Sequence, residues 1–161
     1  MSNVIRSHFW IAFSLMLALV LQVVPWPGAL SDFRPSWVIL VTLYWALALP
    51  HRVNIGIALI VGLTWDLILG STLGVHGFVM AILCYLVTLN FQLLRNLSLW
   101  QQALVMAVLT LTGILMEFWV EYLIAPIHFD VNRFFAVMVN AFIWPWIFLL
   151  LRRMRRKFAI R

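Results

Sequence analysis

Long apolar runs separated by short breaks place the strongest constraint on the fold of this chain. Hydrophobic residues make up 65% of the sequence and charged residues 10%, whereas a soluble domain averages about half apolar and about a quarter charged residues. A soluble domain of 161 residues has one core to fill, and most of its residues must still face water. The sequence therefore predicts an integral membrane protein.

The breaks between the apolar runs locate six predicted membrane helices. A membrane helix needs about twenty residues to cross roughly 30 Å of hydrocarbon, and fewer where the bilayer thins or flanking side chains reach the interface. Prolines and turn-forming residues end the runs. We expect one all-α six-helix bundle, a single polytopic domain over residues 1–161, with helices at about 8–24, 33–50, 53–69, 76–91, 101–125 and 134–151 and a basic tail at 152–161.

The first apolar run also has the form of a secretory signal peptide, because Arg6 and His8 precede it. The residues after this run offer only weak small-residue cleavage sites. Five further apolar segments follow in any case. We interpret the run as a retained first helix.

The distribution of lysine and arginine predicts that both termini are cytoplasmic. Positive charges close to the ends of membrane helices remain on the cytoplasmic side. With the N-terminus inside, the cytoplasmic segments hold Arg6, Arg52, Arg95, Arg152, Arg153, Arg155, Arg156, Lys157 and Arg161, and the other side holds Arg34 and Arg133. An odd number of helices would place the basic tail outside, and the bias of nine against two disfavours that alternative. We expect a multi-pass protein of the bacterial inner membrane.

The basic tail supports three interpretations. It can act as a topology determinant, as a contact for anionic lipids, or as a docking site for an acidic cytoplasmic partner. Six of the 11 basic residues lie in the last ten positions, so the net charge of +6 is concentrated there and predicts no nucleic-acid partner. The six are Arg152, Arg153, Arg155, Arg156, Lys157 and Arg161, and the first five are the candidate interaction residues of the tail.

Three carboxylates at membrane depth are the main candidates for a functional site. Asp66 lies in the third apolar run, and Glu117 and Glu121 are four residues apart in the fifth, which places them on one helical face. Charged groups at this depth are costly and mark functional sites by default. In the predicted topology all three lie toward the outer side, and the nearest basic residues are Arg34, His76, His128 and Arg133. They form a polar pocket or a partner-facing patch. Alternatively, Asp66 and one glutamate form internal ion pairs or hydrogen bonds that fix the helix packing, and Glu121 is solvated at the interface.

Small residues four positions apart occur twice, as Ala58 with Gly62 and as Gly70 with Gly74. Such spacing lets helix backbones approach closely. The approach can occur between helices of the chain or against another membrane helix.

No sequence pattern indicates catalysis, a metal or a cofactor. There is no phosphate-binding loop or nucleophile motif, and the single cysteine, Cys84, has no partner for an internal disulfide. The histidines lie in four different segments without metal-ligand spacing. We therefore expect a protein that is not an enzyme and has no cofactor.

Three stretches of the sequence resemble the MreD family of rod shape-determining proteins of Gram-negative bacteria. They are FRPSWVILVTLYWALALPHRVNIGIALIVGLTWDLILGSTLG, NLSLWQQALVM and NAFIWPWIFLLLRRMRRKF, and the resemblance extends over essentially the whole chain. It implies a noncatalytic subunit of the rod complex, which elongates the cell, acting with MreC, MreB, RodZ and the peptidoglycan polymerase and transpeptidase. More distantly, Asp66 followed by Gly70 and Gly74 in a six-helix chain looks like the substrate-binding subunits of vitamin transporters, as an analogy of fold.

Two functions besides an enzyme remain open at this point. The first is a membrane scaffold that organises peptidoglycan synthesis during lateral wall growth, with helix faces for partner helices. The second is a subunit that binds a small molecule or a lipid-linked precursor. The second function predicts a ligand-sized cavity that reaches the outer carboxylates.

Overall fold

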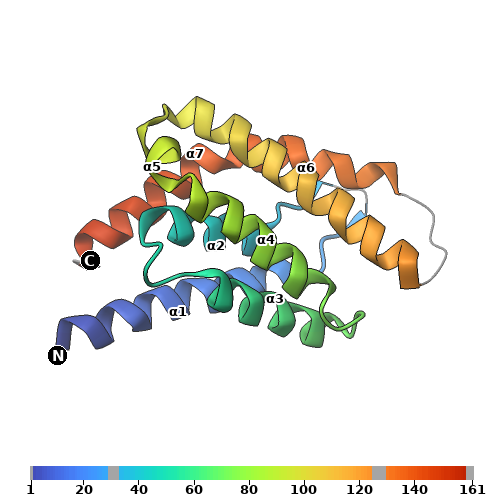
Figure 1. Ribbon diagram of the computed structural model, residues 1–161, viewed down its shortest axis with the longest axis horizontal. Helices are drawn as coiled ribbons and strands as arrows, with labels where there is room; N and C mark the ends of the chain where they lie inside the picture. Colours follow the sequence, from blue (N-terminus) through green and yellow to red (C-terminus); the bar gives the residue numbers. More distant parts are fainter. Residues whose placement is uncertain (1, 29–32, 125–129, 159–161) are drawn as a thin grey trace.

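Helices form every regular element in the described part of the chain. The computed structural model describes residues 2–28, 33–124 and 130–158 (Figure 1). Its elements are α1 (Ser2–Val23), α2 (Trp37–Ala48), α3 (Ile55–Leu69), α4 (Val75–Leu89), α5 (Phe91–Asn96), α6 (Leu99–Ile124), the short 3₁₀ helix η2 (Val131–Arg133) and α7 (Phe134–Lys157). The predicted all-α class is confirmed for these residues.

The short helix α2 lies at the centre of the bundle. It contacts α1, α4, α5 and α7. Its residues from Val38 to Leu47 are all buried, and none is more than 8% exposed. A helix that is apolar on every side is stable only when other elements surround it. α2 is therefore the core around which the longer helices pack.

The helices α3 and α4 pack closely against each other. A Cβ atom placed on Gly62 would lie 2.6 Å from the Cα atom of Gly77 and 2.6 Å from the carbonyl oxygen of His76. Real Cβ atoms do not approach backbone this closely, so only glycine fits. Ala58, one turn earlier, is fully buried. The spacing of Ala58 and Gly62 therefore serves packing within the chain.

The start of α1 and the end of α7 lie at the same end of the bundle, which we call the terminus end (Figure 1). There the rings of Trp10 and Phe158 stack with centroids 3.8 Å apart. The α3–α4 turn and the end of α6 lie at the opposite end. Because the start of α1 and the end of α7 lie at the same end, the fold is consistent with an even number of helices that run along the bundle axis.

Four features of the predicted helix boundaries differ from the structure. The first helix begins at Ser2 rather than at about 8. The second helix begins at Trp37 rather than at 33, because Pro35 disfavours helical backbone at the residue before it. The turn predicted between the helices at 76–91 and 101–125 contains the short helix α5. The last helix continues past 151 to Lys157, since arginine and lysine form helices well and favour the negative end of the helix dipole. The predicted ends at residue 125 and at residues 159–161 lie outside the described residues.

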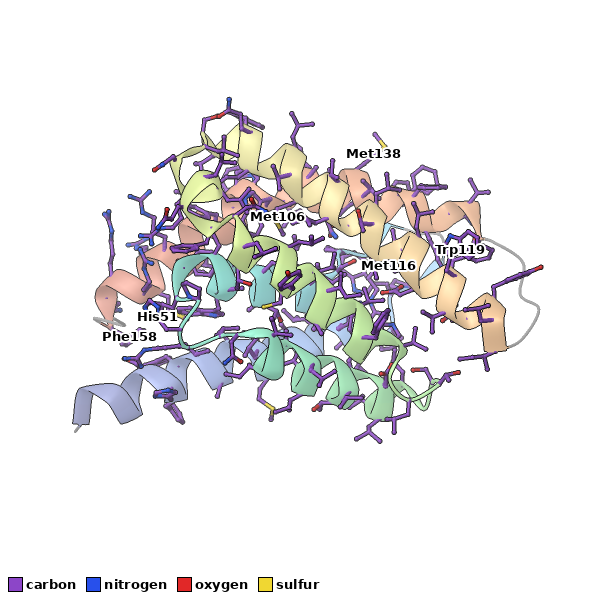
Figure 2. The ribbon with its side chains drawn as sticks, in the orientation of Figure 1. His51, Met106, Met116, Trp119, Met138 and Phe158 are labelled. Carbon is purple, nitrogen blue, oxygen red and sulfur yellow. The ribbon has the colours of Figure 1, made fainter. Side chains whose placement is uncertain are left out.

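Within the described residues, two helical segments are long and apolar enough to cross a membrane. They are Leu99–Ile124 and Val131–Lys157. The apolar stretches of α1, α2, α3 and α4 are shorter. At 1.5 Å per residue the 12 residues of α2 span only about 18 Å. Apolar side chains also cover the outside: Met138 is 71% exposed whereas Met106, between the helices, is 4% exposed (Figure 2). Such an apolar exterior is typical of a membrane protein.

Candidate functional site

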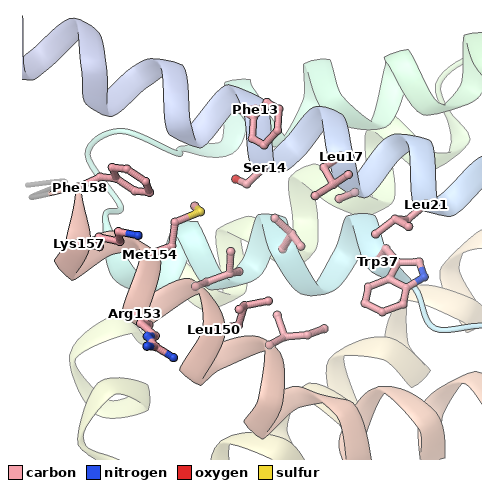
Figure 3. A pocket seen from close by; sticks show the side chains of 14 residues that line it. Phe13, Ser14, Leu17, Leu21, Trp37, Leu150, Arg153, Met154, Lys157 and Phe158 are labelled. Atoms are coloured by element: carbon pink, nitrogen blue, oxygen red, sulfur yellow. The ribbon is translucent and has the colours of Figure 1, made fainter.

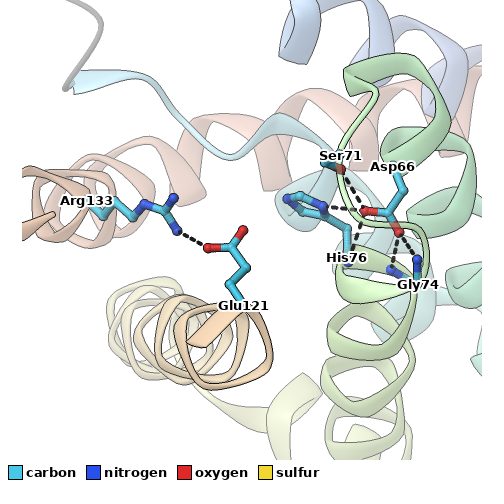
Figure 4. Close-up of polar contacts among 7 residues, drawn as sticks. Asp66, Ser71, Gly74, His76, Glu121 and Arg133 are labelled. Atoms are coloured by element: carbon cyan, nitrogen blue, oxygen red, sulfur yellow. Dashed lines mark hydrogen bonds and ion pairs between the residues drawn. The ribbon is translucent and has the colours of Figure 1, made fainter. Parts of the chain in front are cut away.

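Asp66 is completely buried and joins the end of α3 to the start of α4 (Figure 4). Its Oδ2 atom accepts hydrogen bonds from the backbone N–H groups of Gly74 (2.8 Å) and Gly77 (3.3 Å). Its Oδ1 atom accepts from the backbone N–H of His76 (3.2 Å) and from the Ser71 hydroxyl (3.2 Å). The N–H groups at a helix start lack partners within the helix, and the helix dipole favours a negative charge there. Asp66 therefore caps α4 from the preceding helix.

The His76 side chain completes the Asp66 cluster. Its Nδ1 atom lies 2.6 Å from Asp66 Oδ1, and its ring packs on Trp65 with centroids 4.2 Å apart. The imidazole is 11% exposed and the carboxylate is not exposed at all. Asp66 thus has its hydrogen-bonding capacity filled by its own chain, as in the internal-pairing alternative raised from the sequence.

Gly70 and Gly74 do not pack against a neighbouring helix. Gly70 ends α3 at a φ of 62°, Gly74 precedes α4 at a φ of 101°, and a Cβ on either residue would meet nothing within 4 Å. Their four-residue spacing predicted a packing face only on the assumption of a continuous helix. Because α3 ends at Leu69, both glycines instead supply the left-handed backbone of a tight turn.

The two glutamates of α6 have different surroundings. Glu121 Oε2 lies 3.5 Å from Arg133 Nη1, in a half-exposed ion pair between α6 and η2 (Figure 4). Glu117, one turn earlier, has no hydrogen bond or ion pair to any residue that the structure describes. The expectation that Glu121 is the solvated glutamate is wrong: within the described residues Glu121 has the internal partner and Glu117 has none, because η2 brings Arg133 next to Glu121.

A cavity of about 490 Å³ brings most of the predicted outer residues together. We call it the charged cavity. Residues of α1, the segment before α2, α3, α4, α6, η2 and the start of α7 line it. Its charged and titratable residues are Arg34, His76, Glu117, Glu121, Asp130 and Arg133. Asp66 lies behind His76 and does not line it. His128, also predicted near this level, lies outside the described residues.

Several polar atoms around the charged cavity lack a protein partner. The buried Nε and Nη2 atoms of Arg34, the Nε1 atom of Trp65 and the Oε1 atom of Gln22 make no hydrogen bond within the described part of the chain. Burial lowers the pKa of the Arg34 guanidinium. Buried polar groups normally find a protein group or water as a partner. The cavity can therefore accept water or a polar ligand.

Asn140 of α7 is a buried residue of this region that the sequence analysis missed. Its Oδ1 atom accepts a hydrogen bond from the Ser36 backbone N–H at 2.9 Å, and its Nδ2 atom donates one to Thr110 Oγ1 at 3.0 Å. Asn140 and Thr110 are both fully buried. These bonds join α6 and α7 to the segment that carries Arg34. An amide inside an apolar run was the available signal, because polar groups at membrane depth need a partner.

The predicted basic residues of the tail divide between two sides of α7. Arg153 and Lys157 border an apolar groove of about 580 Å³ between α1, α2 and α7, which we call the lateral groove (Figure 3). Arg152 and Arg155 line a separate pocket with Arg95 of α5. Arg156 is exposed and lines neither hollow.

The charged cavity has the groups to bind complementary charges. Within residues 2–28, 33–124 and 130–158, no three His, Cys, Asp or Glu side chains are grouped so that they could hold a metal ion. The cavity combines guanidinium donors with carboxylate acceptors, which suits recognition by hydrogen bonds and ion pairs.

The sequence is similar to known rod shape-determining proteins along almost all of its length. The family described as rod shape-determining protein MreD matches residues 2–154. The chain is 42% identical over 153 residues to the rod shape-determining protein MreD of Haemophilus influenzae, with 95% of this chain and 94% of the relative covered. No solved structure matches the chain. The analogy to the substrate-binding subunits of vitamin transporters therefore stays a prediction.

Proposed function

We propose, from the premise that this chain belongs to the MreD family of rod shape-determining membrane proteins, that it is a noncatalytic scaffold of the rod complex. In this role it organises peptidoglycan synthesis during lateral wall growth, together with MreC, MreB, RodZ and the peptidoglycan polymerase and transpeptidase. The observation that carries the proposal is an almost wholly apolar exterior with a lateral groove along α1, α2 and α7.

The lateral groove suits side chains of an apolar membrane helix from a partner subunit. Leu17 of α1 and Leu150 of α7 line it and are 49% and 68% exposed. Membrane helices associate through close packing of such surfaces. Arg153 and Lys157 border the same groove, so the partner helix should carry acidic or polar groups at that level.

We further propose that the chain crosses the bacterial inner membrane six times with both termini in the cytoplasm. The terminus end carries Arg95 and the basic last turns of α7, as the positive-inside rule requires of a cytoplasmic face. The short helices are compatible with this topology, because α2 is surrounded by protein and a thinned bilayer accommodates 15-residue helices such as α3 and α4.

Site-specific crosslinking tests the lateral groove. Cys84 is the single cysteine of the sequence, so a Cys84→Ala background leaves each introduced cysteine as the only thiol. Leu17→Cys and Leu150→Cys should crosslink to a membrane helix of a partner subunit in intact membranes. Leu104→Cys on α6, which is 68% exposed and lies outside the groove, is the matched control. Equal crosslinking from all three positions would argue against the groove as the docking face.

Depletion in a rod-shaped cell tests the scaffold role itself. Loss of the protein should round the cells and disperse their elongation complexes. Normal rods with normally localised partners would contradict the proposal.

A second candidate function is binding of a small molecule or a lipid-linked precursor. The charged cavity supports it, because Glu117 and Arg34 line a ligand-sized hollow and form no ion pair within the described part of the chain. Glu117→Gln should then impair function without loss of folding, whereas Tyr122→Phe on the same helix, at a residue that is 54% exposed and does not line the cavity, is the control. A fully functional Glu117→Gln protein would remove this candidate.

A further inference from the structure

A small pocket at the terminus end is lined by three arginines. It encloses about 190 Å³, and its charged residues are Arg95 of α5 with Arg152 and Arg155 of α7. Tyr44 of α2 also lines it, together with apolar groups. We call it the arginine pocket. It is distinct from the lateral groove and from the charged cavity, and the scaffold role does not require it.

The arginine pocket has no counter-charge from its own chain among the described residues. No carboxylate lines it, and none forms an ion pair with any of its three arginines. The sequence contains five acidic residues. Asp66 lies in the cluster at the α3–α4 turn, three others line the charged cavity at the opposite end, and Asp32 lies outside the described residues. The contact of Arg155 Nη1 with the Ala48 carbonyl oxygen is long, at 3.5 Å.

The walls of the arginine pocket are held in place by packing. Tyr44 is 1% exposed, and its ring meets those of Trp45 and Phe148 edge to face, with centroids 5.3 Å and 5.5 Å apart. Arg152 and Arg155 are three residues apart on one helix, so both guanidinium groups lie on the same side of α7. The three arginines come from two helices, and the pocket therefore exists only in the folded bundle.

Three arginines around one small hollow repel one another unless an anion lies between them. Guanidinium groups match the oxygen atoms of a phosphate in pairs of parallel hydrogen bonds. Basic pockets between membrane helices on the cytoplasmic side bind anionic lipid headgroups. The pocket lies where α7 leaves the apolar part of the bundle, which is the level of lipid phosphates in the proposed topology.

We propose that the arginine pocket binds the phosphate group of an anionic ligand through Arg95, Arg152 and Arg155. The phosphate belongs either to the headgroup of an anionic phospholipid or to a free phosphate compound. In both cases it lowers the net positive charge of the three guanidinium groups and joins the ends of α2, α5 and α7.

Titration calorimetry on the full-length chain in neutral detergent tests this site. The probes are dihexanoyl phosphatidylglycerol, dihexanoyl phosphatidylcholine and inorganic phosphate. We expect phosphatidylglycerol to bind at least about tenfold more tightly than phosphatidylcholine. Phosphatidylglycerol has a net negative charge, which strengthens the hydrogen bonds that its phosphate accepts from the arginines. Tight binding of phosphatidylglycerol alone identifies a lipid headgroup, and equally tight binding of inorganic phosphate identifies a free phosphate compound. Binding of neither overturns the proposal.

Matched variants decide whether binding occurs in the pocket. The double variant Arg152→Gln/Arg155→Gln should weaken binding at least about tenfold, whereas Arg156→Gln, an exposed neighbour on the same helix, should change it by less than about twofold. Equal weakening by Arg156→Gln would show general attraction to a basic surface and would overturn the proposal. If circular dichroism shows that the double variant does not fold, Arg95→Gln on α5 supplies the same test from a different helix.

Discussion

Replacing Asp66 by alanine should lower the free energy of unfolding by about 3–5 kcal/mol. The carboxylate makes five hydrogen bonds. Two of them are short: the Gly74 backbone nitrogen lies 2.8 Å from Oδ2, and His76 Nδ1 lies 2.6 Å from Oδ1. A hydrogen bond to a charged group contributes about 1.5–3 kcal/mol, so the two short bonds alone account for this range. The longer bonds, from the Ser71 hydroxyl and from the backbone N–H groups of His76 and Gly77, add less, because their geometry is weaker and water can hydrate the freed hydroxyl.

The comparison with Asp66→Asn separates charge from shape. Asparagine keeps the size of the side chain and one oxygen acceptor, but it loses the charge that favours the start of α4. We expect a loss of about 1–3 kcal/mol for this variant. Glu121→Gln, at a half-exposed ion pair, should change the free energy of unfolding by less than about 1 kcal/mol.

Unfolding in mixed micelles with increasing sodium dodecyl sulfate, followed by circular dichroism, measures these differences. The predicted order of stability is wild type and Glu121→Gln, then Asp66→Asn, then Asp66→Ala. If Asp66→Ala were within about 0.5 kcal/mol of wild type, Asp66 would not be the structural cap of α4. An Asp66→Asn protein less stable than Asp66→Ala would also contradict the reasoning.

Further substitutions test other contacts by the same unfolding measurement. Gly62→Ala should destabilise by about 1–3 kcal/mol, because its Cβ would meet backbone atoms at 2.6 Å, whereas Gly56→Ala, with only one side-chain atom at 3.4 Å, should be neutral or slightly stabilising. Gly70→Ala should cost about 1 kcal/mol through its positive φ, and Gly70→Asn less, although neither side chain would meet a neighbour at Cβ. Asn140→Leu should cost about 1–3 kcal/mol, since the Ser36 backbone N–H then loses its acceptor; an unchanged stability would show that water replaces the amide.

The helices and their approximate positions could be predicted because they depend on local pattern. Runs of apolar residues ended by proline, glycine and polar turns mark helices whatever surrounds them, and most predicted boundaries lie within a few residues of those of the structure. The exceptions are the start of α1, which lies at Ser2 rather than at about 8, the short helix α5 within a polar turn, and the basic end of α7, which has high helix propensity despite its charge.

The candidate site could be predicted only in part. The cost of a charge at membrane depth identified Asp66, Glu117 and Glu121 as candidates from the sequence, and Arg34 was predicted as a basic residue near them. Their different environments could not be deduced, because the partners of Asp66 are backbone N–H groups, which every sequence contains. The same limit applies to Asn140, whose bonds to Ser36 and Thr110 join residues 104 and 30 positions apart.

The sequence by itself therefore determined that this chain is a helical membrane protein with basic residues gathered near its C-terminus, since composition and charge order are properties of the chain alone. Only the tertiary structure decided which charges are paired and which line a hollow. It made α2 the buried centre, used Asp66 as a cap, left Glu117 in the charged cavity and brought Arg95 to the arginines of α7. The physical reason is that pairing and burial depend on distances between helices, which packing sets and local sequence does not encode.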